Sequence, residues 1–185
     1  LEREIAANLS DLAMPRALFQ IEVKQSAEFL PSGRNEAAFL FSAHPGENVK
    51  MLNKIASGGE LSRVALAIKA VCANREQPDV MIFDEIDAGI SAQTAQMVAE
   101  KIASLARSTQ ILCITHLAQI ACMADCHISV SKEVQGERTA TLAEILNGQE
   151  RTTEIAKMLS GTATEQSLLN AAQMLKTAQL KKSLA

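Results

Sequence analysis

Two adjacent carboxylates, Asp84 and Glu85, directly follow the apolar run formed by residues 80–83. Neighbouring residues of a strand point to opposite faces, so two acids at its end are expected to have different tasks. In a nucleotide site, the first acid would hold Mg²⁺, usually through water, and the second would position or deprotonate the attacking water. An acidic cap between a strand and a turn explains the same residues, so the pattern alone leaves both interpretations open.

The sequence Ser57-Gly58-Gly59-Glu60 stands just before a run with helical periodicity, residues 61–73. It would bring a serine hydroxyl and consecutive backbone N–H groups to the start of a helix, which suits the binding of a phosphate. Taken alone, these residues are better explained as a capped helix entry in which the glycines form the turn. The functional interpretation therefore depends on the motifs in combination.

A histidine and a third acid stand near these elements in the sequence. His116 follows the apolar residues 110–115 and is expected at the same sheet edge as the paired acids. An imidazole there can bind a γ-phosphate or the attacking water, and a structural histidine is the alternative. Asp87 could cap a helix beginning near Ser91 or reach across a subunit contact.

Cys122, Cys126 and His127 stand close together and invite a metal-site interpretation. A zinc site normally takes four ligands in two pairs, and the sequence offers no second pair at a suitable spacing. We therefore expect thiols that pack as small apolar side chains.

The composition excludes several classes of protein. Its 185 residues are 48% hydrophobic and 21% charged, with five Phe and no Trp or Tyr, which predicts a single globular domain with an aliphatic core. The net charge of -3 argues against nucleic-acid binding by bulk electrostatics alone. No apolar run approaches the roughly 20 residues of a membrane span, and the cysteine spacing indicates a reducing compartment, by default the cytoplasm.

The elements that must position these residues include a parallel pair of strands. An N-terminal helix stopped by Pro15 and a β-hairpin come first. A strand, a helix and a strand then predict a right-handed parallel crossover, and further strands and helices follow. The predicted helices cover residues 1–12, 61–73, 91–107, 117–124, 149–159 and 164–180, and the predicted strands cover residues 17–24, 37–42, 80–83, 110–115, 127–132 and 139–146.

The ordered set of the glycine motif, the paired acids with Asp87, and His116 resembles the second half of an ABC-type ATPase head. Such heads occur in SMC-like chromosome and repair proteins. The amino-acid sequence of residues 54–63, 83–91 and 113–119 is similar to that of the bacterial DNA double-strand-break repair ATPases. The resemblance implies an α/β fold, the C-terminal lobe of the head, with a mainly parallel sheet flanked by helices. Residues 1–12 would then be the end of a coiled-coil arm, followed by the β-hairpin.

The resemblance also implies roles for individual residues. Asp84 would be the Walker B acid on the Mg²⁺ side, and Glu85 the general base or water-positioning acid. His116 would be the switch histidine and Asp87 the D-loop residue, while Arg63 would at most couple or stabilise. The signature loop, residues 57–60, would contact the γ-phosphate of ATP held by the opposite head, so that two heads sandwich the nucleotide.

A phosphate-binding loop of the form Gly-x-x-x-x-Gly-Lys followed by Ser or Thr is absent from the sequence. Without it the β- and γ-phosphates have no cradle or lysine, so the chain is predicted to be inactive alone. In the family that it resembles, the N-terminal half of the same head supplies the P-loop and Q-loop. A second head in a homodimer and DNA are the other implied partners, in the bacterial nucleoid.

Two other interpretations stay open at this level. The chain could belong to another SMC-like or ABC-type ATPase head, or it could be a non-catalytic module for dimerisation or DNA docking. An isolated half of a head would also expose strand edges and apolar surface, which predicts self-association or partial disorder around Ser57 and Glu85.

Overall fold

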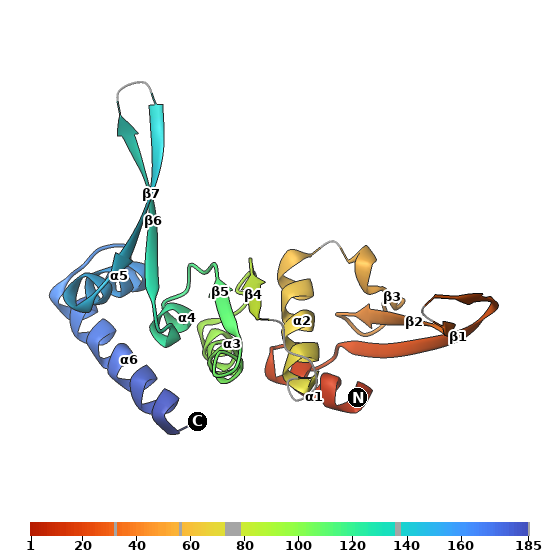
Figure 1. The fold of residues 1–185 in the computed structure, drawn as a ribbon. Coiled ribbons are helices and arrows are strands. Elements are labelled where there is room, and N and C mark those ends of the chain that lie inside the picture. The colour runs from red at the N-terminus through yellow and green to blue at the C-terminus, as the bar shows by residue number, and fades with distance from the viewer. Residues whose placement is uncertain (32, 56, 73–78, 136–137, 185) are drawn as a thin grey trace. The chain divides into compact units, whose positions relative to one another are not determined.

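A computed structural model describes residues 1–31, 33–55, 57–72, 79–135 and 138–184 of the chain. The chain divides into two compact units, Leu1–Ile114 and Thr115–Ala185 (Figure 1). The single domain expected from the chain length stays a prediction. None of the described helices combines the length and the apolar character that a membrane span needs.

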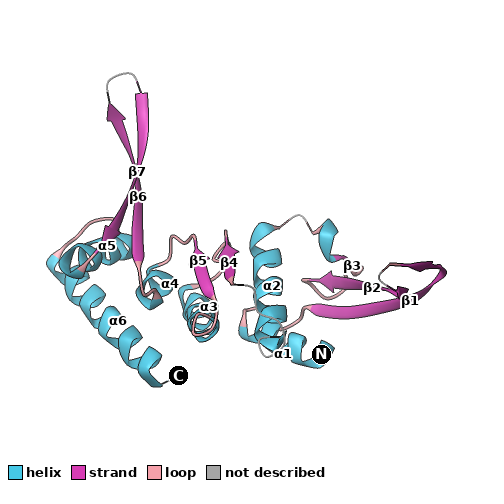
Figure 2. Ribbon diagram, in the orientation of Figure 1, coloured by secondary structure: helices cyan, strands magenta, loops and turns pink. Residues whose placement is uncertain are grey.

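The first unit combines helices with two small sheets (Figure 2). The apolar face of its first helix packs on the two longer helices, with Ile5, Leu9 and Leu12 fully buried. These aliphatic side chains form the core that the composition predicts. The elements are α1 (Glu2–Asp11), β1 (Leu18–Leu30), β2 (Gly33–Ser42), β3 (Lys50–Met51), the 3₁₀ helix η1 (Leu52–Lys54), α2 (Gly58–Cys72), β4 (Val80–Phe83), α3 (Ala92–Leu105) and β5 (Gln110–Cys113).

Helix α1 ends before it reaches Pro15, the predicted stop. The N–H of Met14 donates to the carbonyl of Leu9 at 2.9 Å, and the N–H of Ala13 donates to the carbonyl of Ser10 at 3.3 Å. This pair of bonds is a Schellman turn, and Ala13 takes the left-handed position in it with a φ of 62°. The helix is therefore terminated by its own backbone, and not by the proline.

The predicted β-hairpin is confirmed and is longer than the sequence pattern indicated. Strands β1 and β2 are antiparallel, and Leu18 lies opposite Ser42. The short strand β3 pairs with β2 at the edge of this sheet. The predicted helix over residues 61–73 is also confirmed as α2, although its predicted last residue lies outside the described residues.

Strands β4 and β5 form the predicted parallel pair, joined through α3. In the described residues this is the only parallel pairing, so the expectation of a mainly parallel sheet is wrong for the chain as described. The other strands form hairpins, and hairpins are antiparallel. The buried strand expected at residues 80–83 is buried on one side only, because Ile82 is 67% exposed.

The second unit consists of a short helix, a long hairpin and two C-terminal helices. The two strands are antiparallel, and the hairpin extends away from the helices of its unit (Figure 1). The last two helices are separated at Gly161, which has a φ of 78° and forms the left-handed C-cap that the sequence predicts. The elements are α4 (Ala118–Met123), β6 (His127–Gln135), β7 (Arg138–Leu146), α5 (Gly148–Ser160) and α6 (Glu165–Leu184).

Candidate nucleotide-binding site

The glycine motif forms the first turn of α2. The Oγ of Ser57 accepts a hydrogen bond from the N–H of Glu60 at 3.4 Å, so Ser57 caps the helix. Gly58 and Gly59 are the first residues of the helix itself, and not a turn before it as the sequence analysis assumed. The capped helix entry is therefore present, and it leaves the first N–H groups of α2 without acceptors inside the helix.

The first turn of α2 packs against the loop that follows β4. A methyl group at Gly59 would lie 2.9 Å from the Cβ of Ala88 and 2.9 Å from the carbonyl oxygen of Glu85. A methyl group at Gly58 would lie 2.7 Å from Oε2 of Glu85. Neither glycine has a positive φ, so the close approach, and not the backbone conformation, requires glycine here. Two motifs that are distant in the sequence are thus in contact.

Two side chains of α2 hold this loop through its carbonyl groups. Ser62 Oγ donates to the carbonyl of Asp84 at 2.8 Å. Arg63 Nη1 donates to the carbonyls of Ile86 at 3.3 Å and of Ala88 at 3.0 Å. These bonds fix the backbone on which the paired acids stand.

Arg63 is only 7% exposed. Burial lowers the pKa of its guanidinium, and the nearby carboxylate of Glu60 partly opposes that effect. Sequence reasoning gave Arg63 a minor stabilising role and did not single out Ser62. The spacing of these two residues from Gly59, at i+3 and i+4 on one helix face, was the signal that could have found them.

Asp84 and Glu85 are both exposed and lie beyond the end of β4, in a bend. The alternation of side chains along a strand therefore does not extend to them, and this part of the sequence argument is wrong. Glu85 has a φ of 55°, which is the left-handed region. That conformation costs an ordinary residue about 1–2 kcal/mol, and such strain is concentrated at functional sites.

Asp87 belongs to the same loop, and its side chain is buried, with 3% exposed. The N-cap of α3 is Ser91, whose side chain accepts from the N–H of Thr94 at 3.2 Å. Burial, Asp87 and Asp84 together raise the pKa of the Cys113 thiol to about 12. This thiol is therefore uncharged at neutral pH and behaves as an apolar side chain next to the site.

His116 belongs to the second unit, whereas residues 57–60 and the paired acids belong to the first. Its side chain is exposed, and the neighbouring N–H of Leu117 donates to Oγ1 of Thr115 at 3.1 Å. The strand before it is anchored, because the N–H of Ile114 donates to the carbonyl of Phe83 at 2.9 Å. The expectation that His116 lies beside the paired acids stays a prediction.

Of the two cysteines in the second unit, only Cys122 has the character expected of a packed thiol. Cys122 is 5% exposed, and burial raises its pKa to about 11, although Arg151 opposes the shift. Cys126 is exposed. Within the described ranges, no group of three or more His, Cys, Asp or Glu residues could hold a metal ion.

The fold is that of part of an Smc head domain. The Smc head domain with a coiled coil and joint from Pyrococcus yayanosii matches 96% of this chain and 29% of its own, with a TM-score of 0.53 at 20% identity. The Smc head domain with an extended coiled coil from Pyrococcus furiosus, bound to the C-terminal domain of ScpA, matches 78% of this chain and 34% of its own, with a TM-score of 0.52 at 22% identity. At these identities the likeness defines the fold alone.

Sequence similarity identifies the relatives of this chain more specifically than the fold does. No family model matches the chain. It is 41% identical over 165 residues to the DNA repair protein RecN of Halalkalibacterium halodurans, which covers 87% of this chain and 29% of that protein. It is 39% identical over 194 residues to RecN of Bacillus subtilis, covering 96% of this chain and 34% of that protein. The chain thus spans about a third of the length of the curated relatives it matches, and it corresponds to a C-terminal fragment of RecN.

Proposed function

We propose that the chain is the C-terminal part of the ATPase head of a RecN-type, SMC-like DNA repair protein. It would contribute the signature loop, the Walker B acids, the D-loop and the switch histidine to ATP hydrolysis between two heads. The observation that carries this proposal is the packing of the first turn of α2 against the loop 84–88, through Gly58 and Gly59. This contact supports a coupled unit in which the first turn of α2 and the loop 84–88 respond to each other.

The first turn of α2 fits a phosphate on three grounds. Its first N–H groups lack acceptors within the helix, and a helix of 15 residues directs its positive dipole end at them. Ser57 and Gly58 are exposed, so a ligand can approach. Gly58 and Gly59 carry no side chain that would cover the backbone. The γ-phosphate of ATP held by the opposite head is the ligand proposed for residues 57–60.

The paired acids divide the remaining chemistry. Asp84 would hold Mg²⁺ through water, and one or two carboxylates suffice because Mg²⁺ keeps several waters and binds the phosphates of its nucleotide. The bound ion would neutralise the charge that develops on the phosphates. Glu85 would orient the attacking water or accept its proton. The exposed carboxylates stand on a loop whose backbone is held by Ser62 and Arg63. This supports these roles, since a general base must be held in a fixed position.

The proposed partners follow from what the chain lacks and from its relatives. The polypeptide that carries the P-loop and Q-loop would be the N-terminal half of the same head, and the complete site would need a second head. His116 would contact the γ-phosphate or the water, and Asp87 would serve the contact between heads. DNA is proposed as a partner because the relatives are named DNA repair proteins.

ATP turnover measured with and without the N-terminal half of the head tests this proposal. The chain alone should release no phosphate above background, and the chain combined with that polypeptide should hydrolyse ATP, faster when DNA is present. Turnover by the chain alone would contradict the assignment of the P-loop to another polypeptide. ATP binding by the combined protein without any turnover would favour the non-catalytic docking module.

A further inference from the structure

The helix that follows His116 is too short to be stable by itself. Helix α4 has six residues, and Leu117, directly after His116, is its N-cap. Isolated helices below roughly 12 residues are marginal in water, so α4 depends on tertiary contacts. Its side chains Ala118, Ile120 and Met123 are almost fully buried, and α4 packs on α5 and α6.

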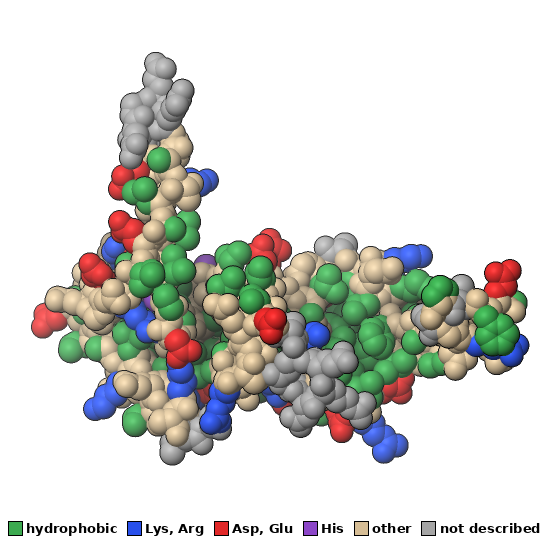
Figure 3. Space-filling model, viewed as in Figure 1, with side chains coloured by type: hydrophobic (Ala, Val, Ile, Leu, Met, Phe, Trp, Pro, Cys, Tyr) green, Lys and Arg blue, Asp and Glu red, His purple; other side chains and the backbone are tan. Residues whose placement is uncertain are grey.

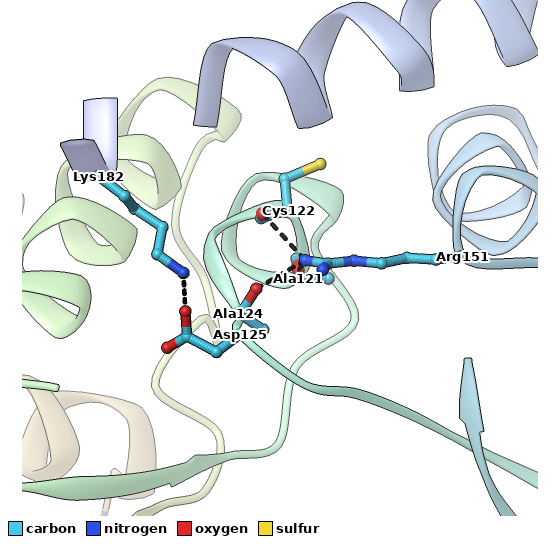
Figure 4. Close-up of polar contacts among 6 residues, drawn as sticks. All are labelled: Ala121, Cys122, Ala124, Asp125, Arg151 and Lys182. Atoms are coloured by element: carbon cyan, nitrogen blue, oxygen red, sulfur yellow. Dashed lines mark hydrogen bonds and ion pairs between the residues drawn. The ribbon is translucent and has the colours of Figure 1, made fainter. Parts of the chain in front are cut away.

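The C-terminal end of α4 is held by one arginine from α5. Arg151 Nη2 donates to the carbonyls of Ala121 and Cys122 at 3.1 Å each, and to the carbonyl of Ala124 at 2.8 Å (Figure 4). Carbonyl groups at a helix C-terminus have no partners inside the helix, and a cation there is favoured by the helix dipole. One side chain thus satisfies several acceptors of the last turn.

A second contact reaches the same end of α4 from α6. Lys182 pairs with Asp125, the residue after Ala124 (Figure 4). The Asp125 side chain is 79% exposed, so this pair contributes little. The Arg151 side chain is more deeply buried at its Nε, which has no hydrogen-bond partner among the described residues. This burial costs free energy, which the hydrogen bonds of Nη2 must offset. Arg151 is therefore the main polar anchor of α4.

We propose that Arg151 is a positioning residue for ATP hydrolysis, which fixes α4 and through it the backbone that carries His116. This inference rests on the proposed function, in which His116 is the switch histidine. The segment 115–117 joins β5 to α4, and its β5 side is already fixed by the bond from Ile114 to Phe83. Its other side is fixed by α4, so loss of the Arg151 contacts would loosen the backbone that carries His116. Arg151 acts through His116 and does not touch the nucleotide.

The first test replaces Arg151 by Met in the full-length protein, which keeps the aliphatic length and removes the donors. We expect kcat for ATP to fall by about tenfold to 10²-fold, with KM within about twofold, because a misplacement of about 1 Å can cost about 10²-fold. Lys157→Ala is the matched control on the same helix, since the one contact that the Lys157 side chain makes among the described residues is an exposed pair with Glu154 at 3.3 Å. It should leave both constants unchanged, and a normal kcat in the Met variant would overturn the proposal.

A double-mutant cycle separates positioning from general stability. His116→Ala should lower kcat, and adding Arg151→Met to it should lower kcat no further, because both changes remove the same contribution. Additive losses would contradict the proposal and leave Arg151 a purely structural residue. If His116→Ala itself leaves turnover unchanged, the proposed role of His116 fails as well, which distinguishes the two failures. Should the Met variant not fold, Arg151→Gln, which keeps an NH₂ donor, takes its place in the same cycle.

Discussion

At Gly59 a methyl group would meet the Cβ of Ala88 and the carbonyl oxygen of Glu85, each at 2.9 Å. At Gly58 it would meet only the end of the flexible Glu85 side chain, at 2.7 Å. The sequence predicts the residue types of this site, because a serine, two glycines and two acids at these positions form recognisable motifs. It does not predict their contact, because residues on separate elements meet only through the packing of α2 against the loop after β4.

Gly59→Ala and Gly58→Ala should therefore differ in stability. The first change forces a methyl group into backbone and Cβ atoms, and we expect a loss of about 1–3 kcal/mol in the free energy of unfolding. The second can be accommodated by rotation of Glu85, and alanine is up to about 1 kcal/mol better than glycine in a helix, so stability should be unchanged or slightly higher. Urea denaturation of both variants decides this, and equal losses would contradict the packing described.

At the scale of elements, the sequence predicted the existence and type of the helices and strands better than their ends. The end of α1 shows the reason. Pro15 is a visible stop signal, but the helix has already ended through the hydrogen bonds of Met14 and Ala13. A left-handed alanine carries no sequence signal, because that position usually belongs to glycine.

Ala13→Gly should stabilise the protein. Ala13 has a φ of 62°, which costs a residue with a Cβ about 1–2 kcal/mol. Glycine removes this cost but loses about 0.4–1 kcal/mol through the greater freedom of the unfolded chain. We expect a net gain of up to about 1 kcal/mol in urea denaturation. A loss of stability would mean that Ala13 does not hold the left-handed position.

His127, the first residue of β6, predicts a sensitivity to acid. Burial lowers the pKa of His127 from its ordinary value of 6.5, Arg151 lowers it further, and Glu154 opposes both. The folded protein thus favours the neutral imidazole, so this contribution is fully present above pH 6.5 and is lost as the pH falls through the lower folded value. The free energy of unfolding should fall across this range, and His127→Gln should flatten the decline. Parallel curves for the two proteins would exclude His127 as the cause.

At the scale of the whole molecule, one face of the parallel sheet is uncovered in the part of the chain that the structure describes. Val80 and Ile82 in β4 and Leu112 in β5 are 45%, 67% and 46% exposed, and Ile82 lies opposite Leu112. Figure 3 shows hydrophobic side chains at the surface over β4 and β5. The sequence predicted these strands but could not predict that the face is bare, since an apolar run is the same whether its cover lies on this chain or on another.

The isolated chain should therefore self-associate through this face. Sedimentation velocity at increasing concentration should detect oligomers, and Ile82→Thr, which keeps a β-branched residue in the strand, should reduce them. Leu169→Gln is the control, since Leu169 is equally exposed, at 62%, but lies on α6. Equal effects of the two substitutions would argue against a specific role of the sheet face.

The central claim is that the acidic loop after β4 belongs to an ATP-hydrolysing site, and Glu85→Gln in the full-length protein tests it most directly. The measurement is ATP turnover beside ATP binding, with Glu144→Gln on the exposed β7 strand as control. We predict that the Glu85→Gln protein still binds ATP and pairs its heads, while its turnover falls by about 10²–10⁴-fold, as expected for loss of a positioned base. Turnover equal to that of the unaltered protein would contradict the claim.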